Sequence, residues 1–108
     1  MNAGKNALHV TFDNGERHEL AAEYLRVESP SAEVQGHGPS QRQTVPGKRH
    51  VKIARLESVG HYAVRIVFDD GHDTGLYTWA YLRELGREHE EKWPAYLEVL
   101  AAQGMQRE

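Results

Sequence analysis

The sequence predicts a single α+β domain in which antiparallel β-hairpins pack against short helices and a longer C-terminal helix. Two segments with alternating apolar residues each run into an Asn-Gly or Asp-Gly turn, and apolar residues at helical spacing come near the end of the chain. A chain of 108 residues is long enough for one hydrophobic core. We expect residues 1–7 to be disordered, residues 8–104 to form the domain and residues 105–108 to be a frayed tail.

The first hairpin is expected at the start of the domain. Residues 8–12 alternate apolar and polar side chains, which is the pattern of a strand with one buried face. An Asn-Gly turn over residues 13–16 follows, and residues 17–20 form the returning strand. Residues 21–27 predict a short helix, which ends before Pro30 because the residue before a proline avoids the α region.

A long loop is expected next. Residues 29–49 contain several glycines and prolines among polar residues. A loop of this length in a small domain is either mobile or functional, and the sequence leaves both interpretations open. Residues 51–59 predict a strand with a bulge, because the apolar positions change phase after Ile53.

The central hairpin covers residues 62–79. Apolar side chains alternate over residues 62–68, and Asp70-Gly71 supplies a turn at which both residues tolerate a positive φ. Residues 74–79 are rich in β-branched and aromatic side chains and predict the returning strand.

The two hairpins resemble each other in sequence. Residues 10–15 (VTFDNG) match residues 66–71 (IVFDDG), and the YLR of residues 24–26 matches the YLR of residues 81–83. Turns with Asn-Gly or Asp-Gly are common, so chance similarity is the alternative interpretation.

Two helices are expected to complete the domain. Residues 80–85 predict a short helix that Gly86 ends in the left-handed region, and residues 87–92 predict a charged connector. Pro94 suits the first turn of the last helix, and Gly104 is expected to end it.

Composition narrows the classes of function. The net charge is −3 with both signs mixed, so neither a nucleic acid nor a membrane surface is expected as a partner. No apolar segment reaches the length of a transmembrane helix and no secretory signal is evident, so we expect a cytoplasmic location. Cysteine is absent, which excludes disulfides, thiolate metal sites and cysteine nucleophiles in this chain.

No catalytic spacing is present. The phosphate loop G-x-x-x-x-G-K-[ST], the serine nucleophile elbow and the H-E-x-x-H pair are all missing, so we expect no enzyme activity. The densest polar cluster comprises Asp69, Asp70, His72 and Asp73, which could hold a cation. The same residue types also favour turns because their side chains bond to the local backbone.

Three segments together resemble a known family. They are YLR at residues 24–26, SPSAEVQGHG at residues 29–38 and, above all, the run of residues 62–79 that includes FDDGHDTGLYTW. They resemble the gamma-butyrobetaine hydroxylase-like N-terminal domain, also called DUF971, over residues 8–100.

The resemblance implies a structural zinc held by three cysteines and by the histidine of the D-G-H turn. That histidine corresponds to His72, whereas the cysteine positions fall at Ser29, Ser31 and Val34. Two hydroxyls and a valine cannot replace three thiolates, so this sequence indicates that the metal has been lost and we expect no cofactor.

The resemblance also implies a function. The domain occurs attached to Fe–S scaffold ATPases of the Mrp type, which suggests an accessory role near metallocofactor assembly. We therefore predict a non-catalytic interaction domain whose partner is another protein. The predicted contact surface comprises His37, Gly38, Asp69, Asp73, Tyr77 and Trp79.

The alternative is a metal-binding domain. It would hold zinc or another metal through His72 with Asp69, Asp73 or His37. Nothing in the sequence specifies the oligomeric state.

Overall fold

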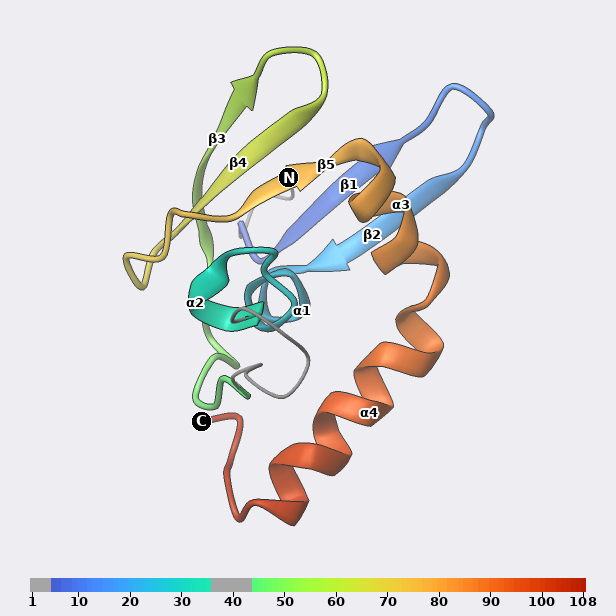
Figure 1. Ribbon diagram of the computed structural model, residues 1–108. Helices are drawn as coiled ribbons and strands as arrows, with labels where there is room; N and C mark the ends of the chain where they lie inside the picture. Colours follow the sequence, from blue (N-terminus) through green and yellow to red (C-terminus); the bar gives the residue numbers. More distant parts are fainter. Residues whose placement is uncertain (1–4, 36–43) are drawn as a thin grey trace.

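The computed structural model describes residues 5–35 and 44–108, apart from the side chains of Ala32 and Glu33. The predicted α+β class is confirmed: strands β1-β2 and β3-β4-β5 form two antiparallel sheets. Both long hairpins point toward one end of the molecule and the last helix lies toward the other (Figure 1). The elements are β1 Ala7–Thr11, β2 Arg17–Ala21, α1 Ala22–Val27, α2 Ala32–Gln35, β3 Ile53–Val59, β4 Ala63–Phe68, β5 Leu76–Thr78, α3 Trp79–Arg87 and α4 His89–Ala102.

The turn after β1 and the turn after β4 have the same geometry. In each, the phenylalanine N–H donates to the carbonyl four residues on, and the glycine N–H donates to the phenylalanine carbonyl. These bonds are Phe12 to Glu16 (2.8 Å) and Gly15 to Phe12 (2.9 Å), and Phe68 to His72 (2.9 Å) and Gly71 to Phe68 (3.2 Å). Gly15 and Gly71 both have a φ of 90°. Of the Asp70-Gly71 pair, only Gly71 has a positive φ: each turn has three residues between the two that the phenylalanine N–H joins, and only the glycine is left-handed.

The sequence repeat is also a structural repeat. The Tyr24 hydroxyl on α1 donates to the Leu85 carbonyl at 2.7 Å, and the matching Tyr81 hydroxyl on α3 donates to the Glu28 carbonyl at 2.5 Å. Glu28 follows Tyr24 by one helical turn, and Leu85 follows Tyr81 by the same spacing. The two units, β1-β2-α1 and β4-β5-α3, therefore make equivalent bonds to each other. The match between the hairpins therefore reflects repeated structure rather than chance.

The arginine after each tyrosine follows the same rule. Arg26 on α1 donates to Asp70 in the turn of the second unit at 2.8 Å. Arg83 on α3 donates to Glu16 in the turn of the first unit at 2.6 Å. Each helix thus holds the turn of the other unit.

Gly86 lies inside α3, so the prediction that it ends this helix was wrong. A Cβ on Gly86 would lie 2.4 Å from the ring of His18. In the other unit, a Cβ on Gly75 would lie 2.6 Å from the Ser29 hydroxyl. Both glycines are required by close approach between the units.

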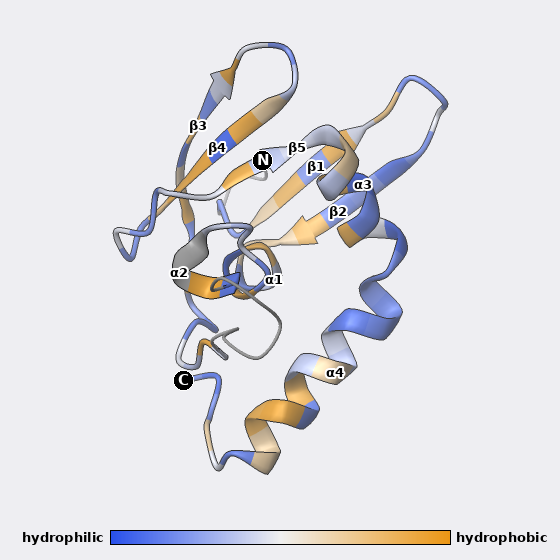
Figure 2. Cartoon of the chain, viewed as in Figure 1, coloured by the Kyte–Doolittle hydropathy of each residue, from blue (hydrophilic) through white to orange (hydrophobic). Residues whose placement is uncertain are grey.

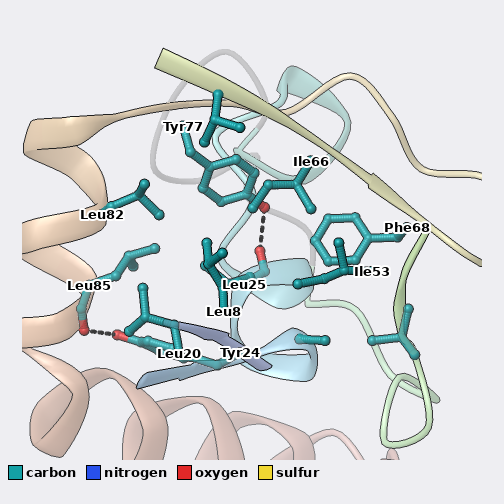
Figure 3. Packing of buried hydrophobic residues seen from close by; sticks show 13 residues of the cluster. Leu8, Leu20, Tyr24, Leu25, Ile53, Ile66, Phe68, Tyr77, Leu82 and Leu85 are labelled. Carbon is teal, nitrogen blue, oxygen red and sulfur yellow. Dashed lines mark hydrogen bonds between the residues drawn. The ribbon is translucent and has the colours of Figure 1, made fainter. Parts of the chain in front are cut away.

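The hydrophobic core fills the space between the two units, and Figure 3 shows side chains of both packed there. Neither unit covers its own apolar face. The buried residues of this core are Leu8, Leu20, Ala22, Tyr24, Leu25, Val51, Ile53, Val64, Ile66, Phe68, Tyr77, Leu82 and Leu85.

The second sheet follows the predicted pattern with one difference. The register between β3 and β4 shifts between Ile53 and Arg55, which confirms the bulge. The returning strand β5 ends at Thr78, because the Thr78 hydroxyl accepts the Tyr81 N–H at 3.1 Å and so caps α3. Trp79 therefore begins a helix instead of ending a strand.

The last helix starts earlier than predicted. Residues 87–92 are helical except at the α3–α4 junction, so Pro94 lies inside α4 and not in its first turn. Figure 2 shows α4 changing from hydrophilic near α3 to hydrophobic toward its end, where Tyr96 and Leu100 pack with Val27. Gly104, with a φ of 68°, follows the helix as expected. In the part of the chain that the structure describes, no helix is both long and apolar enough to cross a bilayer.

Both ends of the described chain are held more firmly than expected. The Lys5 carbonyl accepts the Ile53 N–H at 2.7 Å and the Asn6 carbonyl accepts the Ala22 N–H at 2.8 Å, so residues 5–7 belong to the folded domain. At the other end, the carbonyls of Gln106 and Arg107 each accept an N–H at 2.9 Å, from Gly47 and Arg49 respectively.

The Arg107 side chain adds further contacts between the tail and the domain. Its guanidinium donates to both carboxylate oxygens of Glu23 at 2.9 and 2.6 Å and lies 5.4 Å from the ring centroid of Trp93. Glu23 is buried in α1, and a buried carboxylate requires a cation.

We expect Tyr24→Phe to lower the free energy of unfolding by about 1–3 kcal/mol, because the Leu85 carbonyl loses this buried donor. Tyr81→Phe should act in the same direction. Urea denaturation followed by circular dichroism measures both. The control is Tyr62→Phe, since Tyr62 is 57% exposed. Unchanged stability of Tyr24→Phe would contradict the role of the reciprocal bonds.

Candidate functional site

The predicted metal position lies where the loop after β4 meets the segment after α1. His72 Nε2 is 2.8 Å from Ser29 Oγ, and both side chains are buried. Ser31 Oγ is 2.7 Å from Thr74 Oγ1. Val34 is buried in α2, and its N–H donates to the Ser31 carbonyl at 3.0 Å. The positions that the family resemblance singles out therefore come together in space.

This set of side chains does not fit a zinc ion. It offers one imidazole, two hydroxyls and an isopropyl group, whereas structural zinc sites use thiolates and imidazoles. Among the side chains that the structure describes, no three of His, Cys, Asp or Glu gather in a way that could hold a metal. The hydrogen bonds Ser29–His72 and Ser31–Thr74 instead join the two segments directly.

The carboxylates near His72 face other partners. Asp69 Oδ1 accepts the Lys52 N–H at 3.0 Å, and Asp73 Oδ2 lies 4.0 Å from Arg65 Nη1. The described residues therefore do not assemble the alternative metal site. His37 and Gly38 lie outside the residues that the structure describes.

Asp70 connects the site to three parts of the chain. Its Oδ2 accepts from Arg26 Nε at 2.8 Å and from Lys48 Nζ at 2.6 Å, and its Oδ1 accepts the His72 N–H at 3.1 Å. Burial raises the pKa of Asp70, but hydrogen bonds from Lys48, the His72 N–H and Arg26 together lower that pKa to about 2. The sequence placed Asp70 in a polar turn, yet gave no local signal for its two distant cations.

The predicted contact surface is divided between the two ends of β4. Trp79 lies next to the start of β4, because its backbone N–H donates to the Tyr62 carbonyl at 3.3 Å. Asp69 and Asp73 lie in the loop beyond the other end of the strand. These residues therefore do not form one continuous surface.

Tyr77 is not a contact residue, and its prediction as one was wrong. It is 0% exposed and its hydroxyl donates to the Leu25 carbonyl at 2.5 Å. Because side chains alternate along β5, Tyr77 points into the core while its neighbours Leu76 and Thr78 are exposed.

A groove of about 420 Å³ opens beside Trp79. The indole N–H donates to the His61 carbonyl at 2.9 Å, which fixes the orientation of the ring. In Figure 1, β5 leads into α3 between the two hairpins. The sequence singled out Trp79 but not the rest of the groove, because the turns that build it are distant in sequence. The lining residues are Val10, Thr11, Phe12, Asp13, His61 and Trp79.

Comparison with known proteins agrees with the family resemblance. The model of the family described as "Gamma-butyrobetaine hydroxylase-like, N-terminal" matches residues 1–83. The chain belongs to this family. No curated protein matches the chain.

Solved structures support the same assignment. Two solution NMR structures are 44% and 45% identical to the chain, with TM-scores of 0.81 and 0.84. The alignments cover 96% and 99% of this chain and 82% and 80% of the other chains. A crystal structure from Acidithiobacillus ferrooxidans, of a DUF971 protein of unknown function, is 40% identical with a TM-score of 0.65. Its alignment covers 79% of this chain and 84% of that one.

Acidification should destabilise the protein through Asp70. Because its pKa is lowered on folding, its stabilising effect is complete above about pH 4 and is lost as the pH falls toward 2. We expect Asp70→Asn to lower the free energy of unfolding at pH 7 by about 1–2 kcal/mol and to flatten its decline between pH 4 and 2. Urea denaturation at each pH measures this. Asp13→Asn, in the matching turn, is the control. An equally steep decline in Asp70→Asn would show that another group is responsible.

Restoring thiolates should create a metal site. We expect the variant Ser29→Cys/Ser31→Cys/Val34→Cys to bind about one zinc per chain, because three thiolates would then lie beside His72. Elemental analysis of the purified variant measures the zinc, with the wild-type protein prepared in parallel. Adding His72→Ala should reduce zinc retention. A folded triple variant without zinc would contradict the correspondence of these four positions.

Proposed function

We propose that this protein is a non-catalytic interaction domain that binds another protein through the groove beside Trp79. The observation that carries this proposal is the state of the tryptophan: the residue is 44% exposed, and the orientation of its ring is fixed by the bond to the His61 carbonyl. A large aromatic side chain held ready at the edge of a groove loses little freedom on binding. Tryptophan is also among the residues that contribute most to protein interfaces.

The buried polar groups support a role without catalysis. Ser29 and His72 are close enough to resemble a nucleophile and its base. The Ser29 hydroxyl, however, is fully buried and also accepts the Ser31 N–H at 3.3 Å. It holds a turn of the backbone in place and offers no surface to a substrate.

We further propose a partner from metallocofactor assembly, as the family resemblance implies. The chain has no cysteine, so it would supply no thiolate to an Fe–S cluster. The chain would instead bind such a partner through its surface.

The test compares Trp79→Ala with Val99→Ala. Val99 is an apolar residue of α4, 39% exposed and not part of the groove. A partner recovered with the wild-type protein is purified, and its affinity for each variant is measured by calorimetry. We expect Trp79→Ala to weaken binding by about 30-fold or more and Val99→Ala to leave it unchanged. Circular dichroism confirms that both variants are folded.

Two results would overturn the proposal. One is a partner that binds Trp79→Ala as tightly as the wild-type protein. The other is turnover of a substrate by the purified chain that His72→Ala abolishes.

A further inference from the structure

Among the residues that the structure describes, β3 is an edge strand with one side open, since the sheet order is β3-β4-β5. In an antiparallel sheet, successive residues direct their backbone groups alternately to one side and to the other. The Trp79 N–H donates to the Tyr62 carbonyl, so Tyr62 and, two residues on, Val64 bond toward β5. Ala63 and Arg65 therefore bond toward β3.

The register identifies which backbone groups of β3 are left open. Arg65 pairs with Glu57, so Glu57 directs its N–H and C=O to β4. Its neighbours Leu56 and Ser58 direct theirs away from β4, toward the open side. No residue in the described ranges bonds to Leu56 or Ser58 on that side.

The bulge confirms this alternation and sets the length of the open edge. The register shift between Ile53 and Arg55 reverses the direction of bonding. The Ile53 N–H accordingly points outward, where the Lys5 carbonyl accepts it at 2.7 Å. The open edge therefore runs over residues 54–58.

The side chains on this edge are apolar in the middle and oppositely charged on either side. Leu56 is 37% exposed at the rim of the core, beside buried Ile66. Arg55 and Glu57 lie on the outer face of the sheet, with Arg55 Nε 2.6 Å from Glu57 Oε2. An open edge with an exposed leucine is a template for pairing with another strand.

Two copies of this edge complement each other in one antiparallel register. When Leu56 lies opposite Leu56, Arg55 of each copy lies opposite Glu57 of the other. A register centred on residue 55 would place two arginines opposite each other, and one centred on residue 57 would oppose two glutamates. Unlike charges across a strand pair are favourable and like charges are unfavourable, so the charges select the register centred on Leu56.

We infer that β3 is a self-association surface and that its partner is a second copy of this chain. The backbone groups of Leu56 and Ser58 then bond across a two-fold axis, and the two sheets become one sheet of six strands. Burial of the two Leu56 side chains and the new backbone bonds favour the dimer, while the charged pairs fix its register. A surface of a few residues gives weak, concentration-dependent association.

Reversing the charge at residue 55 in one copy and at residue 57 in the other tests this register. Alone, Arg55→Glu opposes two glutamates and Glu57→Lys opposes lysine to arginine, so each variant should dissociate about tenfold more readily than the wild-type protein. An equimolar mixture of the two variants restores unlike pairs at both positions and should form a mixed dimer. Sedimentation equilibrium over a range of concentrations measures the dissociation constants.

Matched controls change the same charges elsewhere. Arg17→Glu on β2 and Glu98→Lys on α4 are exposed and lie outside the β3-β4-β5 sheet, and should leave association unchanged. Leu56→Lys should give monomers without any change of charge at residues 55 and 57. Hydrogen exchange gives an independent readout: the amides of Leu56 and Ser58 should become protected as the concentration rises, while the Glu57 amide is protected throughout.

Three results would overturn the inference. The first is a wild-type protein that stays monomeric at the highest attainable concentration. The second is a dimer that persists unchanged in Leu56→Lys, which would place the interface elsewhere. The third is a wild-type dimer whose two charge variants dissociate but do not form a mixed dimer, which would exclude the register centred on Leu56.

Discussion

The reciprocal pair of tyrosine hydrogen bonds is the constraint on which the rest of the fold depends. Tyr24 reaches the carbonyl of Leu85, and Tyr81 reaches that of Glu28. In each of the two repeated units, a carbonyl near the end of the helix thus accepts a hydrogen bond from the tyrosine of the other unit. The core lies between the two units. The glycines Gly75 and Gly86 complete this arrangement, because a side chain at either position would hold the units apart.

The polar residues around His72 join separate segments of the fold. The bonds Ser29–His72 and Ser31–Thr74 join segments far apart in sequence, and Asp70 adds two cations to the same junction. Polar groups of the kinds that bind ligands are here bonded to other residues of the chain. The groove that we propose as a contact surface lies at the opposite end of β4, beside Trp79.

Local pattern predicted the elements well and their contacts poorly. Alternation and turn residues located both hairpins, the bulge after Ile53 and α1. Gly86 was misread as a helix end because its role depends on the ring of His18, which is distant in sequence. The family resemblance correctly predicted that Ser29 and His72 lie together, which no local pattern indicated. Tyr77 was wrongly predicted to be exposed, because a strand as short as β5 does not show from its sequence which side chains face the core.

The bond between Glu23 and Arg107 joins residues that are 84 positions apart in the chain. Contacts of such long separation carry a large loop-closure entropy and slow the search for the native state. We expect docking of the tail to be a late event of folding, and its release to be an early step of local unfolding.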